Sequence, residues 1–160
     1  MQFIEELPKD LNTSKVIFLR YDSVTVDAKD KTAKYYQQKH NRNVPAANKE
    51  LAEAAKKYPF EYTIASRKNL DNLKSKGYKY VMDSEAFQNM SVGFRQDYNI
   101  ISYGETRTKT AVSYHYKLYF KDMEKNVAYI ISEKLTENQL YFPKYVMNKF
   151  VISKVKKQYK

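Results

Sequence analysis

The segment FEYTIASRKNLDNLKSKGYKYVMDS, residues 60–84, decides the fold because it holds a strand, a helix and a second strand in immediate succession. Residues 60–66 and 78–84 are short runs rich in β-branched and aromatic side chains, as buried strands are. Ser66 suits the N-cap of the helix between them, and Gly77 suits its left-handed C-cap. Leu70 and Leu73 are expected to face inward. Strands joined in this way argue for a largely parallel sheet with right-handed crossovers.

The residues before this segment follow the same order. KVIFLRY (15–21) reads as a buried strand, and DKTAKYYQQKHN (30–41) has helical composition. We expect the helix to stop at NRNVP, since the residue before a proline is pushed out of the α region, and Pro45 to open a second helix that Pro59 ends. Apolar residues recur on one face of that second helix at Ala47, Leu51, Ala54, Ala55 and Tyr58.

The residues after it change character. YNIISYG (98–104), TAVSYHYKLYF (110–120) and NVAYIIS (126–132) are strand-like, and the short polar loop KDMEK joins the last two into an antiparallel hairpin. Pro143 opens a C-terminal helix, with an apolar stripe at Met147, Val151, Val155 and Tyr159. Residues 85–97 and 104–110 are expected to be mobile loops. The chain is therefore predicted to be a single α/β domain over residues 1–160, with a mixed sheet.

The stretch VSYHYKLYF (112–120) alternates aromatic and polar residues, which suits either a core wall or an exposed stacking platform. A sheet covered by helices needs an apolar face, and the aromatic RNA-binding motif with its glycine is missing here. We therefore predict a core wall. Tyr116 and Leu118 should be buried against a helix, while His115 and Lys117 should lie on the more polar side.

Composition limits the function classes. The 160 residues are 42% hydrophobic and contain no cysteine, which excludes disulfides, thiol catalysis and cysteine-ligated metals. No apolar run is long enough to cross a bilayer. The net charge of +11 suits an anionic partner such as nucleic acid. Only 5 of the 29 basic residues are arginine, however, so we interpret the lysines mainly as a solvated surface.

The search for catalytic motifs finds one acidic candidate. Dinucleotide, Walker, serine-hydrolase and zinc-protease motifs are all missing from the sequence, and no cofactor is expected. Asp22 follows the first strand, and Asp83 and Glu85 follow the third, so the three could hold Mg²⁺ and a phosphorylated substrate at one sheet edge. Against this, Val24 stands where a dehalogenase-type phosphatase needs a second aspartate. Carboxylates after strands also often begin turns.

Both histidines and the C-terminal helix can be explained by roles in the fold alone. His40, near a predicted helix end, is explained by a favourable contact with the helix dipole. His115 is expected on the polar side of its strand. From Asn138 onward the chain has six lysines and no acidic residue, which would suit a helix lying on an anionic membrane. We favour the alternative, in which the stripe packs on the sheet and the lysines face water.

Two stretches together resemble the small α/β domains of bacterial envelope lipoproteins, of the TolB N-terminal, CsgG and LpoB type. They are SRKNLDNLKSKGYKYV (66–81) and YKLYFKDMEKNVAYIIS (116–132), within a resemblance that covers residues 60–135. Asn126 and Tyr129 stand where these domains commonly have glycine and tryptophan. The resemblance implies a non-enzymatic domain that contacts other proteins, and it carries over no site residues.

The first expectation for function is therefore a non-enzymatic protein-interaction domain of the bacterial cell envelope, the mature part of a lipoprotein. Its partners would be other envelope proteins. It would be periplasmic or anchored to the outer membrane if a signal has been removed before Met1, and cytoplasmic otherwise. Two alternatives stay open: a basic nucleic-acid-associated protein, and a Mg²⁺-dependent phosphate-handling enzyme at Asp22, Asp83 and Glu85.

Overall fold

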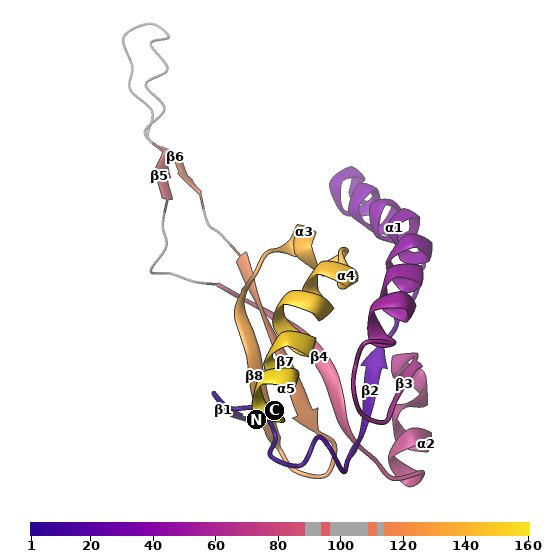
Figure 1. The fold of residues 1–160 in the computed structure, drawn as a ribbon. Helices are drawn as coiled ribbons and strands as arrows, with labels where there is room; N and C mark the ends of the chain where they lie inside the picture. Colours follow the sequence, from indigo (N-terminus) through magenta and orange to yellow (C-terminus); the bar gives the residue numbers. More distant parts are fainter. Residues whose placement is uncertain (89–93, 97–108, 112–113) are drawn as a thin grey trace, which may run out of the picture.

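The computed structural model describes residues 1–88, 94–96, 109–111 and 114–160 (Figure 1). Six strands form one mixed sheet in the order β1-β8-β7-β4-β2-β3. Their bounds are Gln2–Ile4 for β1, Lys15–Leu19 for β2, Tyr62–Ala65 for β3, Tyr78–Gln88 for β4, Tyr114–Asp122 for β7 and Val127–Leu135 for β8. Two further strands, β5 (Phe94–Gln96) and β6 (Lys109–Ala111), pair only with each other.

The pairing confirms the predicted α/β fold with a mixed sheet. β2 pairs in parallel with both β3 and β4, while β4, β7 and β8 are successively antiparallel. The three-residue strand β1, parallel to β8, was not predicted. The predicted strand 98–104 and residues 89–93, 97 and 104–108 of the two predicted mobile loops lie outside the described residues. The described residues of these loops were wrongly predicted, since 85–88 continue β4, 94–96 form β5 and 109 begins β6.

One long helix, α1 (Lys31–Ala55), replaces the two helices that were predicted around Pro45. Asp30 caps it by accepting a hydrogen bond from the amide of Ala33. Pro45 removes one hydrogen bond from the helix interior. The helix continues because buried residues on both sides of the proline hold it against its neighbours, Val44 before and Ala47 and Leu51 after.

The helical connection between β3 and β4 is shorter than the one between β2 and β3, which contains α1. Ser66 begins it, accepting from the amide of Lys68, and the 3₁₀ turn η1 (Arg67–Asn69) leads into α2 (Leu70–Ser75). Gly77 follows with a φ of +87°, so the predicted left-handed position is confirmed. The connections from β2 to β3 and from β3 to β4 run in opposite directions along the sheet. Right-handed crossovers therefore place α1 and α2 on opposite faces.

The C-terminal helix begins at Pro143, as predicted. After the short helix α3 (Glu137–Leu140) it runs through α4 (Pro143–Val146), the π-helical segment η2 (Met147–Ile152) and α5 (Ser153–Gln158). The predicted stripe is buried at Met147, Val151 and Val155. An α-helix turns about 100° per residue, so residues four apart drift around it by about 40° per step. The wider π turn offsets part of this drift and keeps the stripe on the sheet.

The main core lies between the sheet and a layer formed by α1 and the C-terminal helix (Figure 1). Val16 and Phe18 of β2 contribute to it together with Leu118 and Phe120 of β7, all fully or almost fully buried. The predicted core wall is thus confirmed, with Tyr116 partly buried against the same cluster. None of the described helices is long and apolar enough to span a bilayer.

The opposite face of β7 is less polar than predicted. Tyr119 alternates with Leu118 yet is also buried, because its ring packs edge-on against Phe3 of β1 at 5.8 Å between centroids. The ammonium of Lys117 lies 4.4 Å from the centroid of the same Phe3 ring. The unpredicted strand β1 therefore supplies the apolar cover on this side.

Candidate functional site

The predicted acidic site lies where the parallel strands end, but Asp22 and Asp83 accept hydrogen bonds from protein groups. Asp83 and Glu85 lie inside β4 and not after it, which corrects their predicted position. Arg67 donates two hydrogen bonds to Asp83, at 2.8 and 2.7 Å. Glu85 stands opposite Lys117 in the pairing of β4 with β7. Asp83 thus has a cation bound to it, and Glu85 has a lysine opposite it on the neighbouring strand.

Asp22 accepts hydrogen bonds from the hydroxyl of Ser66 and from Nε of Arg20 at 3.1 Å. The hydrogen bond from Ser66 is the main cause that lowers the pKa of Asp22; burial opposes it, and the hydrogen bond from Arg20 lowers the pKa further. A hollow of about 180 Å³ lies nearby, with Arg20, Arg67 and Asp83 in its lining. In the described parts of the chain, no three or more carboxylates or histidines come together in a way that could hold a metal ion.

The two histidines are placed differently from each other. His40 lies well inside α1, so the predicted contact with a helix end is wrong. Its Nδ1 is 2.8 Å from the hydroxyl of Tyr141, and its Nε2 is 2.8 Å from the backbone carbonyl oxygen of Asp22. His115 is half-buried on β7. His40 therefore links three segments that are distant in the sequence: the loop after β2, α1 and the residues before α4.

Amide side chains of α1 hold the extended segment 21–28 alongside the helix. Asn48 accepts from the amide of Tyr21 and donates to its carbonyl, at 2.8 and 2.9 Å. Asn41 makes the same pair of hydrogen bonds with Val24, both at 2.8 Å. Gln37 accepts from the amide of Ala28 at 3.1 Å. These amides replace the backbone partners that a strand would have given the segment.

The large exposed hydrophobic residues come mostly from three segments that hydrogen bonds link to one another: segment 21–28, the first half of α1, and the start of α4 with the residue before it. Among the residues that the structure describes, Met1 is the only other exposed side chain of this kind. Tyr36 and Phe142 are the most exposed, at 54% and 56%. We call this set the apolar end; it consists of Val24, Val26, Tyr35, Tyr36, Phe142 and Tyr145.

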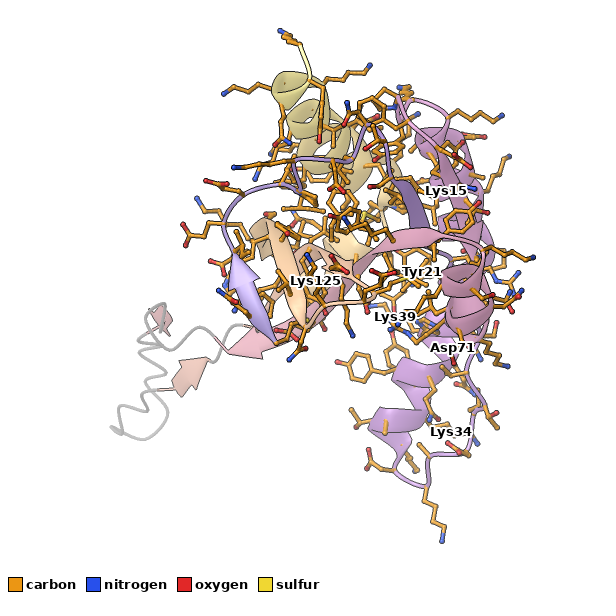
Figure 2. The ribbon with its side chains drawn as sticks, turned by 90° about the horizontal axis from the view of Figure 1, so that it is seen from below. Lys15, Tyr21, Lys34, Lys39, Asp71 and Lys125 are labelled. Carbon is orange, nitrogen blue, oxygen red and sulfur yellow. The ribbon has the colours of Figure 1, made fainter. Side chains whose placement is uncertain are left out.

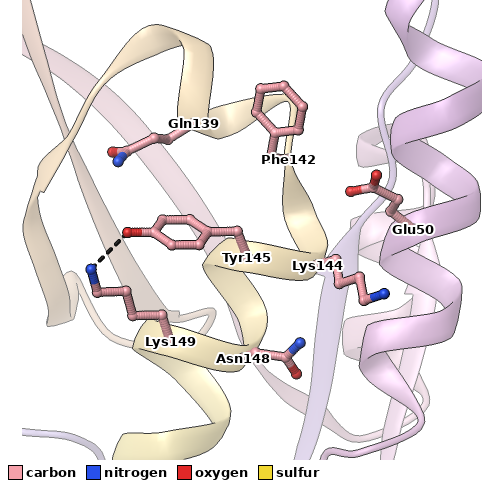
Figure 3. A pocket seen from close by; sticks show the side chains of 7 residues that line it. All are labelled: Glu50, Gln139, Phe142, Lys144, Tyr145, Asn148 and Lys149. Atoms are coloured by element: carbon pink, nitrogen blue, oxygen red, sulfur yellow. Dashed lines mark hydrogen bonds between the residues drawn. The ribbon is translucent and has the colours of Figure 1, made fainter.

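A shallow, open groove of about 800 Å³ lies at this end, between α1 and the C-terminal helix (Figure 3). We call it the α1–α4 groove. Glu50 projects into it from α1, and the other lining side chains come from the C-terminal part of the chain. Its lining consists of Glu50, Gln139, Phe142, Lys144, Tyr145, Asn148 and Lys149. Its volume is that of a typical ligand pocket, although its open shape is that of a docking surface.

The residues beside Phe142 are fixed to the body of the protein, and this fixes Phe142 in its exposed position. The hydroxyl of Tyr21 donates to the carbonyl oxygen of Leu140, and the ring of Tyr21 stacks on that of Tyr141 at 6.1 Å between centroids. Burial raises the pKa of Tyr21 to about 12, so the hydroxyl keeps its proton at neutral pH. Pro143 on the other side is buried. Phe142 is thus an exposed apolar side chain on an anchored stretch of backbone.

The π-helical segment supplies one corner of the groove. Nζ of Lys149 donates to the hydroxyl of Tyr145 at 2.7 Å, as Figure 3 shows. The same ammonium lies 5.0 Å from the centroid of the Tyr145 ring and 5.5 Å from that of Phe150. The hydroxyl of Ser153 donates to the backbone carbonyl oxygen of Lys149. π turns within α-helices frequently occur at functional sites, which makes this corner of interest.

No protein-family model, curated protein sequence or solved structure matches this chain. The candidate site therefore depends on geometry alone. Sequence reasoning missed the apolar end, although two signals were present. Tyr35 and Tyr36 are adjacent aromatics that cannot share one helix face, and Phe142 directly precedes a proline that opens a helix. Neither signal reveals exposure without knowledge of what covers each residue.

Proposed function

We propose that this chain is a non-enzymatic protein-interaction domain that docks a partner through the apolar end. The observation that carries the proposal is the concentration of exposed hydrophobic side chains there. Exposed apolar patches commonly mark interaction sites. The anchored backbone at Phe142, next to a groove, adds to this, because binding hot spots are apolar or aromatic anchors on a fixed scaffold.

The make-up of the apolar end favours a protein partner over nucleic acid. Val24 and Val26 contribute exposed aliphatic surface that cannot stack on bases. Arg42 is the arginine nearest in the sequence to Tyr35 and Tyr36. Its guanidinium already lies over the ring of Tyr35, at 6.0 Å from the centroid. Arginine is the residue that reads phosphate and guanine with two parallel hydrogen bonds. A mixed aliphatic and aromatic surface is more typical of a protein interface.

The proposed location is the bacterial cell envelope, with the chain as the mature part of a lipoprotein. The resemblance of residues 60–135 to small envelope domains supports this part of the proposal. The encoded residues upstream of Met1 test it directly. A signal sequence that ends in a lipidated cysteine would support it, whereas a native start codon at Met1 without such a leader would rule out the export route.

Site-specific photo-crosslinking tests the docking surface. A photoreactive amino acid is placed at Phe142 or Tyr36, and the matched control position is Lys157, an exposed residue on the same C-terminal helix. We expect one and the same protein to be captured from both apolar-end positions in an envelope fraction, and not from position 157. Equal capture at all three positions, or none at the two apolar-end positions in envelope and cytosolic fractions alike, would contradict the proposal.

A further inference from the structure

The α1–α4 groove is lined by two lysines and one carboxylate. Lys144 and Lys149 project from the C-terminal helix, with Lys144 extending toward α1, and Glu50 projects from α1 (Figure 3). The chain has no acidic residue after Asn138, so the C-terminal helix adds no carboxylate to the groove. A ligand in this groove therefore meets two cations and a single carboxylate.

Both lysines are available to a ligand. Among the described residues, neither forms an ion pair with a carboxylate. Lys149 uses one donor on the neutral hydroxyl of Tyr145, and an ammonium group has three. That hydrogen bond and the two adjacent aromatic rings hold the charge at the groove without neutralising it.

We infer that the α1–α4 groove takes an acidic peptide segment of a partner protein. This rests on the proposed function and adds the chemistry of the partner. An apolar or aromatic side chain of the segment packs against Phe142 and Tyr145, and its carboxylates pair with Lys144 and Lys149. Lysine–carboxylate hydrogen bonds are charge-assisted, and partial desolvation beside the two rings strengthens them.

Two other occupants fit the groove less well. A second copy of the chain would bring another +11 of charge toward an already basic surface, which opposes association. An anionic bilayer would have to fill a concave groove and would face the carboxylate of Glu50. Lys34 and Lys39 lie on the first half of α1 (Figure 2), the part of the helix that also carries Tyr35 and Tyr36.

Fluorescence anisotropy with defined peptides tests the inference. The probe is a short labelled peptide in which phenylalanine and leucine alternate with glutamate. One comparison peptide carries lysine for each glutamate, and another carries alanine for each apolar residue. We expect the acidic apolar peptide to bind at least about tenfold more tightly than either, with an affinity that falls as salt is raised, because the contacts are partly exposed ion pairs.

Charge reversal on one helix provides the matched variants. Lys144→Glu with Lys149→Glu should weaken binding of the acidic peptide at least about tenfold. Lys156→Glu with Lys157→Glu changes the net charge equally and lies on α5, away from the groove, so it should change binding less than about twofold. All four lysines are exposed, and thermal unfolding of each variant checks that the fold is kept. Equal loss in both variants would overturn the inference.

Further arms separate the two proposals. With the photoreactive residue at position 36, if Phe142→Ala with Tyr145→Ala abolishes capture of the partner but the acidic and basic peptides bind alike, the docking surface stands and the charge assignment is wrong. If the same double variant keeps the partner, the docking surface itself is wrong. Vesicles containing anionic lipid and a single-stranded oligonucleotide are tested in parallel. Binding of either that depends on Lys144 and Lys149, without a preference for the acidic peptide, overturns the inference.

Discussion

Replacing Leu118 by alanine should destabilise the fold far more than replacing its neighbour Lys117. Leu118 is 4% exposed and belongs to the main core cluster between the sheet and the helices. The side chain of Lys117 points to the other face, is 22% exposed and forms a 3.8 Å ion pair with Glu133. Because the two positions are adjacent on β7, local strand propensity is nearly the same at both.

The expected cost at Leu118 follows from burial and from the space left behind. Leucine to alanine removes three carbon groups, at about 0.8 kcal/mol each, so the lost transfer free energy is about 2.4 kcal/mol. Unfilled space adds about 24 cal/mol per Å³, so a residual void of about 40 Å³ adds about 1 kcal/mol. Leu118 already lines the 180 Å³ hollow, which leaves few neighbours that can move in. We therefore expect a loss of about 3–4 kcal/mol.

Urea and thermal unfolding followed by far-ultraviolet circular dichroism measure the difference. For a domain of this size, the loss at Leu118 corresponds to a fall in Tm of about 10 °C. Lys117→Ala removes a partly exposed ion pair and a contact with the Phe3 ring, so it should cost no more than about 1 kcal/mol. A larger loss at Lys117 than at Leu118 would show that the assigned register of β7 is shifted by one residue.

Three further outcomes are expected. Partial burial raises the pKa of Asp10, but hydrogen bonds from Lys79 and two hydroxyl groups outweigh it and hold the pKa at about 2. This carboxylate therefore stabilises the fold fully above its ordinary pKa of 3.8 and loses that contribution as pH falls through about 2. Measuring Tm against pH for the native chain and for Asp10→Asn will check this. Millimolar Mg²⁺ should leave Tm unchanged in a thermal-shift assay, because Arg67 occupies both oxygens of Asp83; a clear rise would revive the acidic site. Asn41→Ala should speed hydrogen exchange at the amide of residue 24 with a global loss of only about 0.5–1.5 kcal/mol, and unchanged exchange there would show that the amide contact does not hold segment 21–28.

The sheet was largely predictable from the sequence because its signals are local. The succession of strands and helices over residues 15–84 implies that β2, β3 and β4 run parallel, and the KDMEK loop implies the hairpin of β7 and β8. That β2 lies between β3 and β4 is not implied by this order. The break at Pro45 was wrongly predicted because local proline geometry was given more weight than tertiary contacts. The buried side chains at Val44, Ala47 and Leu51 hold α1 continuous through it.

The candidate site was not predictable in the same way. Segment 21–28 is held in place by the side-chain amides of Gln37, Asn41 and Asn48 on α1. These polar residues share one helix face, but a pattern of hydrophobic residues cannot reveal them. The link from His40 to Tyr141 spans 101 residues of sequence. Phe142 is exposed because none of the described elements packs over it, and a local sequence pattern does not show which elements will pack over a given side chain. Each of these features depends on contacts between distant segments and not on a local pattern.

At the apolar end, the lysines should affect association between molecules, whereas lysines elsewhere on the surface mainly interact with water. Exposed aromatic and aliphatic side chains promote non-specific association, and like charges beside them oppose it. We therefore expect the lysines around the groove to disfavour association between free copies of the chain. The same lysines would attract a segment of opposite charge, so one set of residues both disfavours self-association and selects an acidic partner. Neutralising Lys144 and Lys149 should then have two effects together: weaker binding of the acidic peptide, and self-association at lower protein concentration, measurable by sedimentation velocity. If neutralisation weakened peptide binding but left self-association unchanged, the protective role of these lysines would be wrong while their role in recognition would stand.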